Sequence, residues 1–413
     1  MKTLSFLLIG VLALAAGARA AQPVNPPGLL PTAVVRPLLE GDPRVSAARA
    51  GLEVGRQEAG ILDQSPYEWT PRVTGQQRRI DTGLRYNEWN VGIERTIRLP
   101  GKATADRNIG RATLEASQAR YGEALHETAR DFMGLWVDWL AAEQALELAT
   151  RNLESVQESL SVVEKRSRAG DASKLDASIA RAELSEQRRL HNDAKTQASA
   201  AWLRLSTHFP ALPRQIVPLP PPLAVGEDAA FWRQRILAES DELKVAEAEM
   251  RIAQAHAERA RADRTPDPTL GVFTASEFGN QERIFGLAIS IPIPGGGRDA
   301  RSARATATIE VSRQGIESVK RRLEAGVASA VATARGANDS LSIANEGAAT
   351  MSENARLMQR AYALGEAELQ ALLLARRQAT TATTNALQAQ VTALKAYYGL
   401  LIDAHLIWDL AHD

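Results

Sequence analysis

Residues 285–297 decide the fold of this chain, and they run Phe285-Gly286-Leu287-Ala288-Ile289-Ser290-Ile291-Pro292-Ile293-Pro294-Gly295-Gly296-Gly297. Every second residue as far as Ile291 is large and apolar, whereas the residues between are glycine, alanine or serine. A period of two indicates a β-strand with one apolar face. The glycines at 295–297 follow this strand and precede a helix, but they lack the lysine and the later glycine of a phosphate loop. We interpret them as a backbone hinge.

An earlier segment alternates in the same way, since Trp89, Val91 and Ile93 are apolar and the residues between them are polar or small. Apolar residues on one face and polar residues on the other are typical of a membrane β-barrel wall. Strands near 72–80 and 269–278 alternate less well. The polar segments 81–88 and 276–283 are expected to be exposed turns.

Four strands are too few to close a barrel, because an open edge in lipid leaves backbone groups without partners. Several chains must therefore share one barrel, and three chains would give twelve strands, an even number within the usual range.

The same landmarks occur twice, at a separation of about 195 residues. Residues 71–75, 93–101 and 168–172 correspond to 268–271, 287–295 and 363–367. We therefore expect a signal peptide at 1–20, a first structural repeat with its linker at 21–225, and a second repeat at 226–413. The proline-rich stretch 210–222 is predicted to be a linker or a surface strap.

The long helices are predicted from heptads. No proline occurs between Lys102 and Arg168, and one seam is apolar at every seventh position: Leu125, Phe132, Trp139, Leu146, Leu153 and Leu160. A repeat held over this length imposes a supercoil against neighbouring helices, and about 65 residues at about 1.5 Å each give a rod of about 100 Å. The second copy covers about 299–362. This periodicity alone leaves an ordinary coiled coil without a conduit as the alternative.

Shorter helices flank the rods. The first helix is expected to begin near Asp42-Pro43, and its counterpart to cover 231–263. The last helix is predicted from apolar or aromatic residues and one histidine at spacings of four and three: Leu387, Val391, Leu394, Tyr398, Leu401, His405 and Trp408. The fold class is therefore mainly α, with long helical rods and four strands per chain.

The N-terminus has a charged start, an apolar run to Ala16 and the small-residue end Ala18-Arg19-Ala20, the order of a cleaved secretory signal. The chain contains no cysteine, which excludes disulfides, thiolate metal sites and a lipidated N-terminal cysteine. Without Lys2 and Arg19, 47 basic and 49 acidic residues remain, a formal net charge of −2. This balance does not indicate nucleic-acid binding.

Taken together, these residues resemble the TolC family of outer-membrane efflux proteins. The likeness rests on residues 267–271, on 287–298 and on the segments around Gly170 and Gly365. Within that family the chain is similar to the outer-membrane component of cobalt-zinc-cadmium and related heavy-metal efflux systems. The resemblance implies a homotrimer in outer-membrane lipid. In it, a long antiparallel coiled-coil α-barrel forms a tunnel across the periplasm, and the four strands of each chain together form a small 12-stranded membrane β-barrel.

The resemblance also implies partners and site residues. A periplasmic adaptor contacts the helix tips, and an inner-membrane transporter of the resistance-nodulation-division (RND) class supplies the energy. The residues that match the tips are Arg168, Gly170, Asp171, Leu364, Gly365 and Glu366. Hinges between barrel and tunnel are expected at Pro100, Gly101, Pro292, Pro294, Gly295, Gly296 and Gly297. Asp176 matches the place of a pore-lining acid, with a solvated helix face as the alternative.

No catalytic constellation is found, and no enzyme activity, cofactor or metal site is expected. The six histidines show no spacing of a helical zinc site. The predicted function is an exit duct for a tripartite pump, conducting divalent heavy-metal cations by resemblance alone. Organic compounds are the alternative substrate, and a periplasmic coiled-coil adaptor is the alternative protein class.

Overall fold

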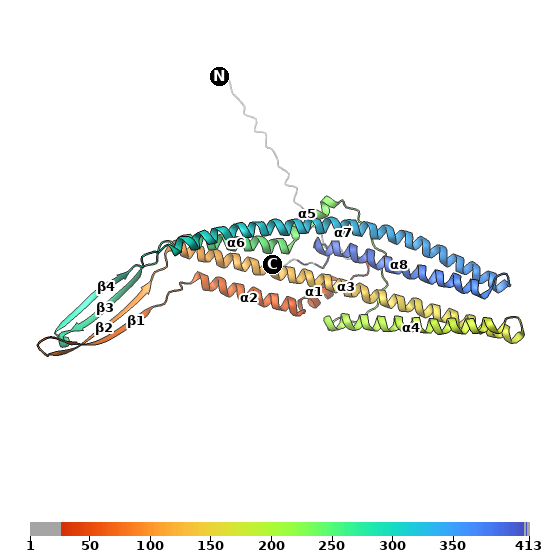
Figure 1. Cartoon of the computed structure of the whole chain (residues 1–413), viewed down its shortest axis with the longest axis horizontal. Coiled ribbons are helices and arrows are strands. Elements are labelled where there is room, and N and C mark those ends of the chain that lie inside the picture. Colours follow the sequence, from red (N-terminus) through yellow and green to blue (C-terminus); the bar gives the residue numbers. More distant parts are fainter. Residues whose placement is uncertain (1–25, 409, 411–413) are drawn as a thin grey trace, which may run out of the picture.

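The computed structural model describes residues 26–408 and 410, so the expected signal peptide lies outside the described residues. The described chain is elongated, with a four-stranded sheet at one end and two long helical hairpins reaching toward the other (Figure 1). Among the described residues, no helix is both long enough and apolar enough to cross a membrane.

The elements follow the same order in each half of the chain. The first half contains α1 (Thr32–Glu40), α2 (Pro43–Asp63), β1 (Thr70–Arg79), β2 (Arg85–Thr96), α3 (Pro100–Ala169) and α4 (Lys174–His208). The second half contains α5 (Ala229–Glu239), α6 (Asp241–Ala262), β3 (Thr269–Glu277), the short helix η1 (Phe278–Asn280), β4 (Glu282–Ser290), α7 (Gly297–Leu364) and α8 (Leu369–Asp403).

The flanking helices differ in part from the prediction. The start at Asp42-Pro43 is confirmed for α2, where the Asp42 carboxylate accepts the Arg44 N–H at 2.8 Å. A shorter helix, α1, precedes it. The counterpart predicted as one helix over 231–263 is two helices, because Ser240 has a non-helical backbone and its side chain accepts the Leu243 N–H at 3.2 Å to begin α6.

The sheet is antiparallel throughout and its strands follow the order β1-β2-β3-β4. The pairing of β2 with β3 joins the two halves of the chain, and Val91 lies opposite Thr274 there. The predicted turns at 81–88 and 276–283 are too long, since the ladders continue to Arg79–Arg85 and Glu277–Glu282. Polar side chains do not end these strands because backbone hydrogen bonds form the ladder.

The two rods are confirmed, as α3 has 70 residues and α7 has 68. Helix α3 packs against α4, α2, α6 and α8, whereas α7 packs mainly against α8 and α6. Within the predicted seam of α3, Leu125, Phe132 and Trp139 are fully buried, while the three members nearer the hairpin end are half-buried. A thin layer of helices covers each seam residue on fewer sides than a globular core does.

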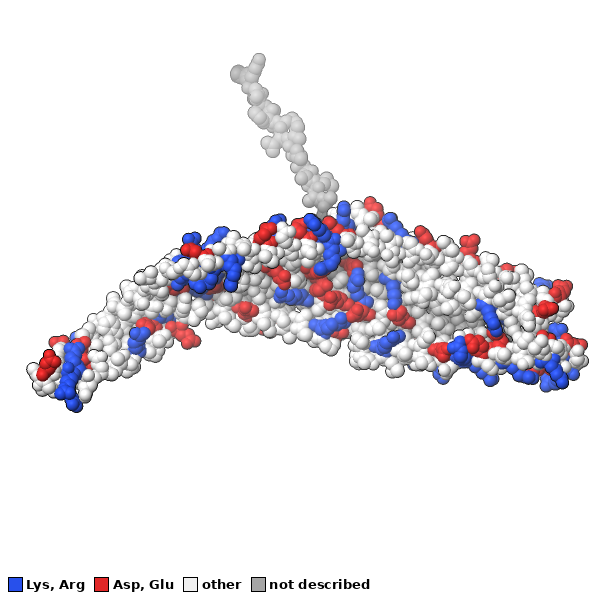
Figure 2. Space-filling view, in the orientation of Figure 1, with Lys and Arg blue, Asp and Glu red and all other residues white. Residues whose placement is uncertain are grey.

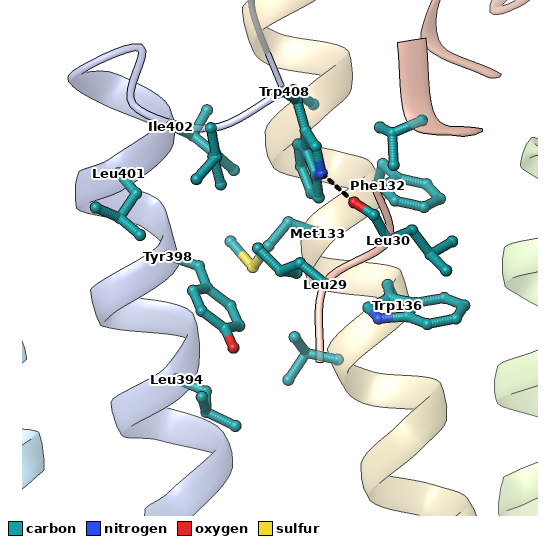
Figure 3. Packing of buried hydrophobic residues seen from close by; sticks show 14 of the residues in the cluster. Leu29, Leu30, Phe132, Met133, Trp136, Leu394, Tyr398, Leu401, Ile402 and Trp408 are labelled. Atoms are coloured by element: carbon teal, nitrogen blue, oxygen red, sulfur yellow. Dashed lines mark hydrogen bonds between the residues drawn. The ribbon is translucent and has the colours of Figure 1, made fainter. Parts of the chain in front are cut away.

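The main apolar core lies midway along the molecule, where α3 and α8 enclose the segment before α1 (Figure 3). Three aromatic side chains hold the carbonyls of that segment: the Trp136 indole N–H donates to Gly28 at 3.0 Å, Trp408 to Leu30 at 2.9 Å, and the Tyr398 hydroxyl to Pro27 at 2.8 Å. Each buried polar atom of these rings thus has a partner.

The proline-rich stretch is a strap over the same core. Phe209, Leu212 and Leu219 on or beside it are buried, and the Gln390 amide donates to the Pro220 carbonyl at 2.9 Å. The last helix is shorter than predicted: α8 ends at Asp403, and the chain beyond turns at His405 and Trp408, both with positive φ. His405 and Trp408 thus match the helical spacing in sequence without being helical, and the Trp408 side chain reaches the core from a turn.

Replacing Trp136 with alanine is expected to lower the free energy of unfolding by about 3–5 kcal/mol, because the side chain is fully buried. Urea titration followed by far-ultraviolet circular dichroism measures the change. Leu203→Ala, at a side chain 61% exposed on α4, is the control and should change stability by less than about 0.5 kcal/mol. Equal effects of both variants would contradict this account of the core.

Candidate functional site

The sheet has one apolar face that is exposed to solvent in the single chain. The register places Val73, Val91, Thr274 and Phe285 in one row across the four strands, and the next row holds Pro71, Ile93, Val272 and Leu287. All of these residues except Thr274 are apolar, and all are exposed, Phe285 by 78% and Leu287 by 76%. The predicted alternation is confirmed, and β3, which alternates less clearly in sequence, continues the same band. We call this the outward face.

The opposite, inward face carries paired charges. Arg72 contacts Glu94 at 2.8 Å, and Arg78 bridges Glu88 at 2.9 Å and Glu277 at 2.8 Å. The Gln76 amide also donates to Glu88 at 2.8 Å. A hollow of about 320 Å³ along the sheet is lined by all of these residues except Arg78. Acidic groups are thus kept on one side of the sheet.

A buried ionic network joins the sheet to the helices. Lys102 in the first turn of α3 contacts Asp267, just before β3, at 3.0 Å, and both side chains are at most 4% exposed. The Tyr67 hydroxyl donates to Asp267 at 2.8 Å, and the Leu99 N–H donates to it at 3.1 Å. Because all of these contacts cross between segments far apart in sequence, they fix the angle at which strands pass into helices.

A second charge cluster adjoins the first. Asp106 on α3 accepts from Arg98 at 3.1 Å and from Arg259 of α6 at 2.6 Å, and Arg98 also donates to the carbonyls of Leu62 and Asp63. No local pattern in the sequence indicates these two networks. Asp267 lies in a motif that carried the resemblance, but its partners could not be identified without the fold.

The structure places the predicted hinge residues between sheet and helices. Pro100 is the first residue of α3 and Gly101 the second, while Gly297 begins α7. Pro292, Pro294, Gly295 and Gly296 lie between β4 and α7. Their role as hinges stays a prediction.

The predicted tip residues lie at the turns of the two long hairpins. Gly170 and Gly365 end α3 and α7 in the left-handed conformation, with φ of 89° and 80°. The Asp171 N–H then donates to the Arg166 carbonyl, and the Glu366 N–H to the Ala361 carbonyl, both at 2.9 Å. This is the hydrogen bond of a Schellman cap, and it explains glycine at both positions.

Asp176 forms a capping box with Ser173. Its carboxylate accepts the Ser173 N–H at 3.1 Å, and the Ser173 hydroxyl oxygen accepts the Asp176 N–H at 3.0 Å. This contact gives a structural reason for an acid at this place. A pore-lining role for Asp176 stays a prediction.

Near the tips, α8 is linked to the first hairpin by two arginines. Arg377 pairs with Glu183 of α4, whose side chain is 4% exposed, and Arg376 donates to the Ser159 hydroxyl of α3 at 2.7 Å. Burial lowers the pKa of Arg376, whereas the hydrogen bond to Glu183 raises the pKa of Arg377. These contacts hold the two hairpins side by side within one chain.

A cavity of about 650 Å³ lies between α3, α6, α7 and α8 at mid-length. His126 and Asp403 line it 3.1 Å apart, and the rings of His126 and His405 are 5.6 Å apart. Sequence spacing did not indicate this meeting, since 277 residues separate His126 from Asp403. Among residues 26–408 and 410, no group of three or more histidine, aspartate or glutamate residues is arranged to hold a metal ion.

The environment of this cluster shifts its titration. Burial lowers the pKa of His405, an effect that the carboxylate of Asp241 only partly offsets. Burial acts to raise the pKa of Asp403, but hydrogen bonds from His126 and Arg130 outweigh it, and the pKa is lowered. The folded chain therefore favours a neutral His405 beside an ionised Asp403.

The family model described as outer membrane efflux protein matches residues 34–208 and 232–401. Protein CyaE of Bordetella pertussis is 27% identical over 269 residues, which cover 62% of this chain and 56% of that protein, so the match spans little more than half of the relative's length.

The fold is similar to solved structures. A crystal structure of CusC aligns with a TM-score of 0.72 at 19% identity, over 90% of this chain and 92% of that chain. The open state of the Neisseria gonorrhoeae MtrE outer membrane channel aligns with a TM-score of 0.73 at 19% identity, over 92% and 89%. At these identities the likeness concerns the fold.

Acidification is expected to destabilise the protein through His405. Because its folded pKa lies below the ordinary value of 6.5, the unfolded chain binds more protons than the folded chain as pH falls below about 6.5. The stability due to the neutral ring is fully present above this pH and is lost as pH falls toward the folded pKa.

Thermal denaturation at pH 7.5, 6.5 and 5.5 measures this effect. His405→Asn should reduce the fall in melting temperature, because it removes the ionisable ring. Asparagine is chosen because it tolerates the φ of 52° at this position. His256→Asn, at an exposed histidine, is the matched control and should keep the wild-type response. An unchanged pH response of the His405 variant would refute the assignment.

Proposed function

Because the chain belongs to the outer membrane efflux protein family, we propose that it is the exit duct of a tripartite efflux pump and conducts substrate passively across periplasm and outer membrane. The observation that carries this proposal is the exposed apolar outward face of the sheet. Two rows of mainly apolar side chains cross all four strands there, whereas every acidic side chain of the strands lies on the inward face. Such a face suits lipid and not water.

The edges of the sheet support a shared barrel. Within residues 26–408 of the single chain, β1 and β4 each pair on one side only, so a row of backbone N–H and C=O groups has no strand partner there. In lipid each unpaired group costs several kcal/mol, and closure satisfies them all. A homotrimer places the β4 edge of each copy beside the β1 edge of the next and gives twelve strands.

The helical hairpins are proposed as the tunnel wall. Helices α3 and α7 have about the same length and end at Schellman caps, so both tips lie at about the same distance from the sheet (Figure 1). The tips at Arg168–Asp171 and Leu364–Glu366 are proposed to contact a periplasmic adaptor, and an inner-membrane transporter of the RND class is proposed as the energy source. The alternative that this chain is itself a periplasmic adaptor is less well supported, because its two hairpins share one sheet whose outward face is apolar and suited to contact lipid.

The inward face favours cations as substrate. Its strands carry four acids, Glu88, Glu94, Glu277 and Glu282, against the two bases Arg72 and Arg78. A lining with excess negative charge attracts cations and repels anions. Together with the resemblance to heavy-metal efflux components, this lining supports divalent heavy-metal cations as the proposed cargo.

A charge on the outward face should prevent membrane assembly. Leu287→Arg is expected to cost about 2–4 kcal/mol per copy in lipid and to reduce the amount of heat-sensitive, detergent-resistant trimer in outer membranes. Ala288→Arg, at the next residue on the inward face, is the matched control and should assemble like the wild type. Mass analysis in detergent with and without heating provides the measurement. A wild-type protein found as a water-soluble monomer would refute the duct.

Cation preference should appear in planar bilayers. The reversal potential in a potassium chloride gradient is expected to indicate cation selectivity, and Glu282→Lys should weaken it because this carboxylate lies on the inward face. A deletion strain should become sensitive to cobalt, zinc or cadmium salts. Sensitivity to organic compounds alone would reject the metal cargo while leaving the duct in place.

A further inference from the structure

The outward face of the sheet is charged at its far end, and all of that charge is positive. Arg79 and Arg85 lie directly opposite each other in the β1–β2 ladder, and the register puts both on the face that carries Val73 and Val91. Arg283 lies on the same face of β4, opposite Ser276 and one row beyond Phe285. Charged side chains gather at this end of the molecule, beyond a stretch of sheet nearly without them (Figure 2).

The acids of the same end point the other way. Glu88, Glu277 and Glu282 are on the inward face, and Arg78 neutralises two of them there. In the described part of the chain, Arg79, Arg85 and Arg283 are exposed and form no ion pair or side-chain hydrogen bond. Like charges directly opposite in a ladder repel each other, so the Arg79–Arg85 pair favours a shared anion.

The position of these arginines along the strands matches a membrane boundary. On the outward face of β2, Arg95 lies at the helix-side end, where its guanidinium is 5.4 Å from the Trp69 ring, and Arg85 lies ten residues away. At about 3.4 Å per residue and a tilt of about 40°, this distance spans about 26 Å in height, close to the apolar band of about 25 Å in outer-membrane barrels. Arg85 then stands at the level of the lipid headgroups.

We propose that Arg79, Arg85 and Arg283 form a phosphate-binding rim on the outward face, which holds the phosphate groups of lipids in the outer leaflet. This inference rests on the proposed duct, because it takes the sheet to span the membrane with its hairpin turns outermost. Guanidinium groups bind phosphate through paired N–H donors, and the apolar rows beneath the rim contact the acyl chains of the same lipid. A free phosphate ion gains only the first of these contacts.

The test uses the full-length protein purified in detergent, with lipid A as the probe. Native mass spectrometry counts lipid molecules retained per trimer after incubation with lipid A that bears both phosphates, or with lipid A from which they have been removed. The variants are R79Q/R85Q/R283Q, the charge-retaining R79K/R85K/R283K, and R72Q as an inward-face control. Inorganic phosphate at millimolar concentration is added as a competitor.

The wild type and R72Q should retain phosphorylated lipid A, and the glutamine variant should bind it at least tenfold more weakly. The lysine variant should lie between them, because an ammonium group keeps the charge but not the paired donors. Removing the lipid's phosphates should weaken binding to the wild type by a similar factor, and inorganic phosphate should not displace the lipid. Equal retention by the glutamine variant, equal retention of phosphate-free lipid, or displacement by inorganic phosphate would each overturn the rim.

The failure of the duct itself gives a different result. If the wild type forms no heat-sensitive trimer and no conducting pore, both proposals are wrong. If it forms both and the glutamine variant assembles normally but still binds the lipid, only the phosphate-binding rim is wrong.

Discussion

The antiparallel pairing of β2 with β3 is the constraint on which the rest of the structure depends. It joins strands 173 or more residues apart in the chain, as the hydroxyl contact of Thr96 with Thr269 at 2.8 Å illustrates. Because β4 pairs antiparallel with β3 in turn, β2 and β4 run in the same direction, and α3 and α7, which follow them, leave the sheet on the same side. Helix α6 of the second half then packs against both rods, α3 of the first half and α7 of its own half.

The buried ionic network supports this arrangement at the point where strands end. A lysine and an aspartate, both at most 4% exposed, would each cost several kcal/mol if left alone, so the pair persists only with its full set of hydrogen bonds. Asp267 obtains them from Tyr67, Leu99 and Lys102 of the first half while belonging to the second. The network therefore specifies how the halves meet, and apolar packing along the thin helical layer does the rest.

Much of this fold could be predicted from sequence because its signals are periodic. The heptads of α3 and the alternation at Phe285–Ile291 depend on local geometry, and both were recognised correctly. The errors lie where tertiary contacts override local signals. Ser240 divides the predicted helix because its side chain caps the start of α6. The polar ends of the strands pair with each other, and the Trp408 side chain is buried although its backbone lies in a turn. The meeting of His126 with Asp403 depends on the packing of α3 against α8, which no local pattern contains.

The separation of charge between the faces also explains why turn length matters in this chain. Because side chains alternate with a period of two, a slip of one residue in the β1–β2 ladder would move Glu88 and Glu94 to the outward face. The tight turn resists this slip, since the Ile80 N–H donates to the Leu84 carbonyl at 3.1 Å and the Gly83 N–H to the Ile80 carbonyl at 2.8 Å. On the β3–β4 side, η1 performs the same task, and the Phe278 ring lies 4.8 Å from the Arg78 guanidinium that neutralises the inward acids. The turns thus keep every strand acid away from the face proposed to meet lipid, and a sequence that altered their length by one residue would lose that face even with every strand residue unchanged.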